Sequence, residues 1–108
     1  MTELEIIKEA VEAYAKAASD QWERDFKTDR GSCGGMMLGY RSNTKFAKAL
    51  VESGYGMAMG PKTYITNKAL PAGIRSQHME IEIQGCRAFR AVTEKHGVMP
   101  TEARTFVD

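Results

Sequence analysis

The stretch ELEIIKEAVEAYAKAASDQWERDFK, residues 3–27, decides the fold that we expect from this sequence. Its apolar side chains recur every three or four residues, which is the spacing of one face of an α-helix. They are Leu4, Ile7, Val11, Tyr14, Ala18, Trp22 and Phe26. Thr2 and Glu5 have the spacing of a capping box, in which each residue satisfies a backbone N–H at the start of a helix. The pattern predicts one amphipathic helix from Glu3 to about Lys27.

The length of this helix suggests a second copy of the chain. At about 1.5 Å per residue the helix would be about 37 Å long, whereas a compact domain of this size is about 33 Å across. Its apolar stripe needs cover along the whole length, and a second copy is the simplest cover. We therefore expect Tyr14, Trp22 and Phe26 to lie at an interface between copies, in a homodimer or small ring.

Length and composition indicate one small globular domain, residues 1–108. The formal net charge of +1 gives no support to nucleic acid as a partner. No apolar run is long enough to cross a membrane, and the acidic, helical start is unlike a secretory signal, so we expect a cytoplasmic protein without a membrane partner. Leu, Ile, Val and Phe are few, while seven methionines offer adaptable apolar surface. A thin core of this kind also favours self-association.

The rest of the chain predicts an α+β fold: a small antiparallel sheet of three to four strands, covered on one face by helices. The expected strands are 36–40, 55–59, 62–66 and 78–84, and the last is the clearest because Met79, Ile81 and Ile83 alternate with polar residues. A second helix is expected from Ser42, as its N-cap, to Ser53. A third helix is expected from Cys86 to His96.

The start of the second helix is the best candidate for a small-molecule site. A helix N-terminus carries unpaired N–H groups and a positive dipole end, which suit phosphate or carboxylate. The residues that would form this anion site are Tyr40, Arg41, Ser42, Asn43, Thr44 and Lys45, with the tyrosine stacking on a ring. The sequence matches neither a P-loop nor a dinucleotide fingerprint. An ordinary solvent-exposed helix cap therefore remains the alternative.

The loop 67–77 is the candidate site for a macromolecular partner. It is long for a connection between strands, and long loops often bind other molecules. Its apolar tip with an adjacent arginine resembles a small interface hot spot, formed by Leu70, Pro71, Ile74 and Arg75. The alternative is that Leu70 and Ile74 fold back and close the end of the sheet.

Residues typical of catalysis and metal binding are few. Cys33 lies in a glycine-rich loop and is a candidate nucleophile, but no catalytic histidine has a spacing that recommends it. Glu80 and Glu82 would share one strand face, where Lys62 on a neighbouring strand is the simplest partner for them. We expect no catalytic residue, no metal site and no cofactor.

These observations predict a non-enzymatic, homo-oligomeric interaction protein that regulates or inhibits a macromolecular partner, which we expect to be a protein. Two alternatives stay open. One is a binder of an anionic small molecule, such as a nucleotide, at the start of the second helix. The other is a cysteine-dependent enzyme that uses Cys33.

Overall fold

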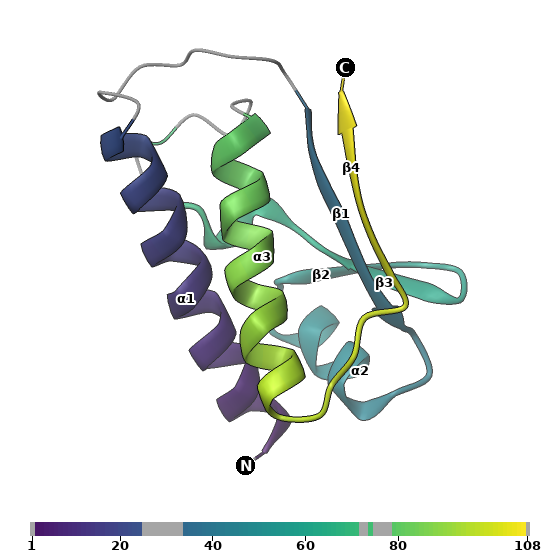
Figure 1. Ribbon diagram of the computed structural model, residues 1–108. Helices are drawn as coiled ribbons and strands as arrows, with labels where there is room; N and C mark the ends of the chain where they lie inside the picture. Colours follow the sequence, from purple (N-terminus) through teal and green to yellow (C-terminus); the bar gives the residue numbers. More distant parts are fainter. Residues whose placement is uncertain (1, 25–33, 72–73, 75–78, 108) are drawn as a thin grey trace.

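The computed structural model describes residues 2–24, 34–71, 74 and 79–107, and it has the expected α+β architecture (Figure 1). The helices are α1 (Glu3–Arg24), α2 (Lys45–Glu52) and α3 (Met79–Lys95), with a short 3₁₀ helix, η1 (Asn67–Ala69). The strands are β1 (Gly34–Arg41), β2 (Gly56–Met59), β3 (Lys62–Ile65) and β4 (Glu102–Val107). Among the helices of the described residues, none is long and apolar enough to cross a membrane.

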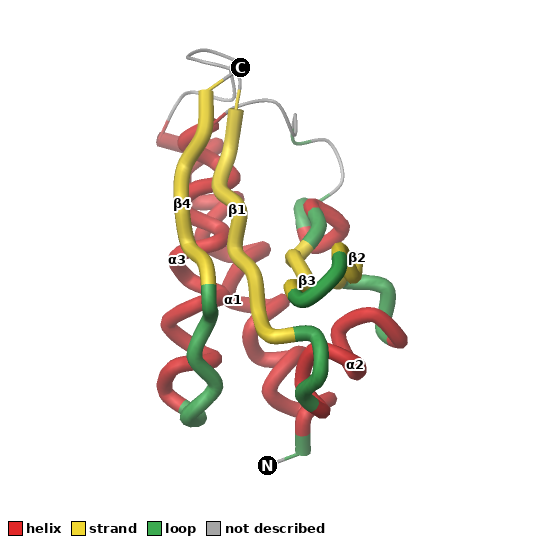
Figure 2. Tube along the Cα trace, turned by 90° about the vertical axis from the view of Figure 1, so that its right-hand side faces the viewer, coloured by secondary structure: helices red, strands yellow, loops and turns green. Residues whose placement is uncertain are grey.

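The four strands form one antiparallel sheet in the order β2-β3-β1-β4. Figure 2 shows the strands in front and the helices α1 and α3 behind them. The helices therefore cover a single face, as predicted. Leu38 and Tyr40 of β1 point into this helical layer and are buried in the core.

Helix α1 begins with the predicted capping box and is covered by its own chain. Glu5 Oε1 accepts a hydrogen bond from Thr2 N at 3.1 Å, and Glu5 N donates one to Thr2 Oγ1 at 3.2 Å. The buried face packs against α3, which runs antiparallel beside α1 in Figure 1. Tyr14 is only 1% exposed, so this residue of the expected interface between copies belongs to the core of its own subunit.

The comparison of helix length with body size was wrong because the molecule is not spherical. Its extents are 39 × 27 × 21 Å, so the long dimension accommodates α1 beside α3. Trp22 is half-buried and packs against the core. Phe26 lies outside the described residues. From Ile7 to Trp22 the apolar stripe is therefore covered within one chain, whereas Leu4 at its start is 62% exposed. Self-association through α1 stays a prediction.

The predicted strand 78–84 is wrong, since Met79–Lys95 is one helix. Ile81 and Ile83 are both buried although they lie on different sides of this helix, because α3 packs between α1 and the sheet. Gly85, which directly precedes the predicted third helix, lies inside α3, where a Cβ would be 2.7 Å from the Tyr14 ring. The glycine allows α1 and α3 to approach closely at this point.

Helix α2 begins two residues later than predicted. Its N-cap is Thr44, whose hydroxyl accepts a hydrogen bond from Ala47 N at 3.2 Å. Ser42, the predicted cap, instead shares a hydrogen bond with the hydroxyl of buried Thr63, at 2.9 Å.

Candidate functional site

The face of the sheet that points away from α1 and α3 is the candidate functional site. Residues that pair directly across two antiparallel strands point to the same side. The pairings of β3 with β1 and β2 therefore place Arg41, Lys62 and Met59 in one row across the sheet. Applied to residues 37–41 of β1 and to the residues in register with them on the other three strands, this argument defines what we call the outer face: Met37, Gly39, Arg41, Met57, Met59, Lys62, Tyr64, Glu102 and Arg104. No helix of the described chain lies over the sheet in Figure 2.

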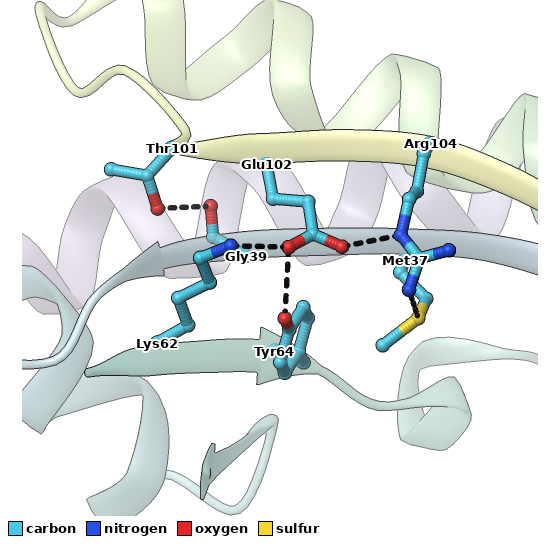
Figure 3. Close-up of polar contacts among 7 residues, drawn as sticks. All are labelled: Met37, Gly39, Lys62, Tyr64, Thr101, Glu102 and Arg104. Atoms are coloured by element: carbon cyan, nitrogen blue, oxygen red, sulfur yellow. Dashed lines mark hydrogen bonds and ion pairs between the residues drawn. The ribbon is translucent and has the colours of Figure 1, made fainter. Parts of the chain in front are cut away.

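Glu102 is the centre of a polar network on the outer face (Figure 3). Its Oε1 accepts hydrogen bonds from Lys62 Nζ at 2.5 Å and from Tyr64 Oη at 3.0 Å. Its Oε2 accepts a hydrogen bond from Arg104 Nε at 2.6 Å, and Nη2 of the same arginine lies 3.3 Å from Met37 Sδ. Because β1 runs between β3 and β4, the network links three strands.

Gly39 provides the space over β1 that this network needs. It pairs with Tyr64 across the two strands. A Cβ at residue 39 would lie 2.9 Å from Tyr64 Cε1, closer than side-chain carbons approach one another. The glycine therefore lets the tyrosine ring lie across β1, so that its hydroxyl reaches Glu102 on β4.

The network consists of satisfied ion pairs and not of groups poised to exchange protons. Hydrogen bonds from Lys62, Arg104 and Tyr64 lower the pKa of the Glu102 carboxyl to about 2. Partial burial, followed by the hydrogen bond to Glu102, raises the pKa of Tyr64, so the phenol stays protonated. The hydrogen bond to Glu102 likewise raises the pKa of Lys62.

The outer face carries three cations and one carboxylate, so it is positively charged. The side chain of Arg104 is 62% exposed although it contacts Glu102. Arg41 is exposed and makes no ion pair with any residue that the structure describes. These two arginines are therefore available to a ligand.

The exposed strand β2 adds an apolar part to the outer face. Met57 and Met59 are 58% and 56% exposed, and Met37 is half-buried. Exposed methionines at one place are a feature of binding surfaces, because the flexible thioether chain adapts to different partners. The outer face thus combines apolar contact with positive charge.

All six residues of the predicted anion site line one of two hollows, and Arg41 lines both. The first hollow, of about 460 Å³, is lined by Arg41, Ser42, Asn43, Gly60 and Pro61. The second, of about 310 Å³, is lined by Glu3, Tyr40, Arg41, Thr44, Lys45, Phe46, Gly97, Val98 and Met99.

Half of the predicted anion site is already occupied by internal contacts. Tyr40 is buried and its hydroxyl shares a hydrogen bond with Thr93 at 2.8 Å, so it is not available to stack on a ligand. The hydroxyls of Ser42 and Thr44 are used in the contacts described above. Arg41, Asn43 and Lys45 remain exposed.

The predicted partner loop does not present an apolar tip within the part that the structure describes. Leu70 and Ile74 are half-buried and pack against the core, so they fold back onto the protein; that they close the end of the sheet stays a prediction. Pro71 is also half-buried. Arg75 lies outside the described residues, as does the candidate nucleophile Cys33.

The remaining candidate residues contribute to packing rather than to a reactive site. Cys86 is buried, and burial raises the pKa of its thiol to about 12, so it stays protonated. Glu80 lies on a helix, where its Oε1 accepts a hydrogen bond from Gln84 Nε2 at 2.7 Å. Among the described residues, no group of three or more His, Cys, Asp or Glu could hold a metal ion.

The outer face was missed in the sequence because its cations and its carboxylate lie far apart along the chain. Lys62 pairs with Glu102 and not with Glu80 or Glu82, which the mistaken strand 78–84 had placed nearby. The only local signal is the alternation of charged and small residues in EARTFV, residues 102–107, which is typical of an edge strand. Comparison with protein-family models, curated proteins and solved structures gives no match, so the outer face is interpreted from its own geometry.

Proposed function

We propose that this chain is a non-enzymatic interaction protein that binds a macromolecular partner, a protein, through its outer face. The observation that carries the proposal is a sheet face that no described helix covers, where two exposed methionines share the surface with Arg41, which makes no ion pair with any described residue. A large apolar side chain left in water forgoes about 1.5–3 kcal/mol relative to burial. Exposed apolar groups gathered beside charged ones are typical of surfaces that bind proteins.

Two parts of the original expectation stay predictions. Regulation or inhibition of the partner depends on which surface of that partner is covered. Self-association is the other, although the buried side chains of α1 are covered by the same chain. A mass measurement of the native protein decides whether a second copy is bound.

Photo-crosslinking in cells that express the protein tests the proposal. A photo-reactive amino acid at Met59 should give a crosslinked protein product, whereas the same group at Glu12 should not, because Glu12 is an exposed residue of α1 in the opposite layer. The variant Arg41→Glu should lower the yield from position 59, while Lys8→Glu, another exposed change on α1, should leave it unchanged. Equal products from positions 59 and 12 would contradict the proposal.

The two hollows that share Arg41 favour a second candidate function, the binding of an anionic small molecule. Arg41 and Lys45 supply positive charge next to the start of α2, although Glu3 in the second hollow opposes an anion. A panel of nucleotides in a thermal-shift assay tests it. A ligand at about a hundred times its Kd should stabilise the fold by about 2.7 kcal/mol. An equal response of Arg41→Ala and of the control Lys8→Ala would contradict this candidate.

A further inference from the structure

The outer face carries more positive than negative charge, so a partner with carboxylates can neutralise the excess. Glu102 is already shared among Lys62, Tyr64 and Arg104, and it is the only carboxylate of the outer face. Arg41 has no acidic partner among the described residues. Charge complementarity therefore favours a partner that brings carboxylates to the two arginines.

The register of the sheet sets the distance between Arg41 and Arg104. Arg104 pairs with Met37, which is four residues before Arg41 on β1. Four residues span about 13 Å along a strand and the neighbouring strand is about 5 Å away, so the two positions are about 14 Å apart. An extended peptide spans this distance with two acidic residues four positions apart. Alternate residues of a strand share one side, so both acids and the residue midway between them face the sheet.

Apolar contact is available beside this line of charge. Met37 lies opposite Arg104, and Met57 and Met59 lie on β2 at the edge of the sheet. The row midway between the two arginines contains Gly39, with the ring of Tyr64 across it and Met57 beside Tyr64. An aliphatic side chain midway between the two carboxylates would therefore meet the Tyr64 ring, with Met57 next to it.

Other occupants fit the outer face less well. Two copies joined through this face would bring together surfaces that each carry three cations and one carboxylate, which is unfavourable. Single-stranded nucleic acid needs aromatic side chains on which bases stack. Tyr64 is the aromatic residue between the two arginines, and its ring lies over Gly39 with the hydroxyl held by Glu102. Phe106 is exposed two residues beyond Arg104 on β4, so it offers one ring at the end of the line of charge and not a series of stacking rings along it.

We infer that the docking element of the partner is an extended acidic peptide segment, in which two carboxylates four residues apart flank an aliphatic side chain. The carboxylates bind Arg41 and Arg104, and the aliphatic side chain packs on the Tyr64 ring beside Met57. This inference rests on the proposed function, because it names the chemistry of the partner at the same surface.

The seven methionines provide reporters for a direct test by NMR of methyl-labelled methionine. The probe is a terminally blocked peptide, TDTLTDT, and its neutral counterpart TNTLTNT is the control. The acidic peptide should shift the methyl signals of Met37, Met57 and Met59 and leave that of Met79, at the start of α3, unchanged. The neutral peptide should bind about fivefold more weakly, the effect expected for loss of exposed ion pairs.

Variants that each remove one positive charge test whether the named arginine binds the acidic peptide. Arg41→Gln should weaken the acidic peptide about threefold without disturbing the fold, because the side chain has no internal partner among the described residues. Lys8→Gln, an equal loss of charge on α1, should leave binding unchanged. Added salt should weaken the wild-type complex.

Four results would overturn the inference. They are equal binding of the two peptides, shifts at Met99 in the hollow beside α2 in place of the outer face, stronger binding of oligothymidylate at the same methyl groups, and a dimer that already buries the methionines. If crosslinking from Met59 succeeds while the acidic peptide fails, the peptide class is wrong and the proposed function stands. If both fail, the proposed function is wrong as well.

Discussion

Glu102 couples the charge of the outer face to the stability of the fold. Its pKa is about 2 in the folded protein, below its ordinary value of 4.5. A group whose pKa is lowered by folding stabilises the protein above the unfolded value and loses that effect as the pH falls through the folded value. The contribution of Glu102 is therefore complete above about pH 5 and is lost between 4.5 and about 2.

We expect Glu102→Gln to be less stable than the wild type at neutral pH, and the difference to shrink as the pH falls toward 2.5. Urea unfolding at a series of pH values measures it. Glu12→Gln, at an exposed position of α1, is the matched control and should show no such pH-dependent difference. A difference between Glu102→Gln and wild type that stays constant with pH would mean that the carboxylate is not titrating in this range.

Gly85 is the second residue that deserves a direct test. A Cβ at this position would lie 2.7 Å from two carbons of the Tyr14 ring, which is itself buried. Overpacking a core costs about 1–3 kcal/mol, whereas replacing a helical glycine with alanine gains about 1 kcal/mol of helix propensity. We expect Gly85→Ala to lose about 1 kcal/mol in urea unfolding.

The control for Gly85 uses the residue that it contacts. In a Tyr14→Leu background the ring is absent, so Gly85→Ala should become neutral or stabilising relative to that background. If Gly85→Ala stabilised the wild type, the Tyr14 ring would be able to move aside without lowering the free energy of unfolding, and the predicted clash would be wrong.

At the scale of elements, the N-cap of α2 should make a measurable contribution to the stability of the fold. Thr44 accepts from Ala47 N, and its own hydroxyl donates to Arg41 O at 2.9 Å. Thr44→Ala should destabilise the protein by about 1 kcal/mol, and Thr44→Ser should recover most of the loss. Asn43→Ala, next to it and exposed, should have little effect. Thermal or urea unfolding of these variants measures the difference, and equal losses for Asn43→Ala and Thr44→Ala would contradict the capping role.

Helix α3 shows where local sequence pattern is ambiguous. Met79, Ile81 and Ile83 alternate as in a strand, yet Ile81, Gly85 and Phe89 have the four-residue spacing of a helix. The helix forms because this spacing continues over seventeen residues and packs against α1, whereas the alternation covers only the first turn and a half. The capping box of α1 and the strand at 36–40 were predictable because their signals are local.

The outer face was not predictable because it depends on strand order. Lys62 and Glu102 are forty positions apart, and they meet only because β1 lies between β3 and β4 and has Gly39 at the crossing point. The predicted anion site, by contrast, is a continuous stretch, so its residues lie close together in the fold, although the sequence did not indicate that Tyr40, Ser42 and Thr44 make internal hydrogen bonds. Anion binding there stays a prediction.

At the scale of the whole molecule, the burial of the apolar side chains of α1 bears on whether the protein needs a second copy to fold. Buried side chains from Ile6 to Ala18 lie within one chain, and the ion pair of Glu9 with Lys95 joins α1 to the end of α3. The thin core suggested that a second copy is needed for stability, whereas these contacts are made within one chain, so we predict that one chain folds without a second copy.

We therefore expect the thermal midpoint of unfolding to stay constant over about a hundredfold range of protein concentration, because a fold that requires a second copy is stabilised by mass action. Light scattering on the same samples reports the mass, and Met59→Ser, which alters an exposed side chain, is the control for weak association through β2. A midpoint that falls on dilution in the wild type would show that a second copy covers apolar surface. If Met59→Ser lowered the midpoint to the diluted value and abolished its dependence on concentration, β2 would be the place where the copies meet, and the acidic partner inferred for the outer face would be wrong.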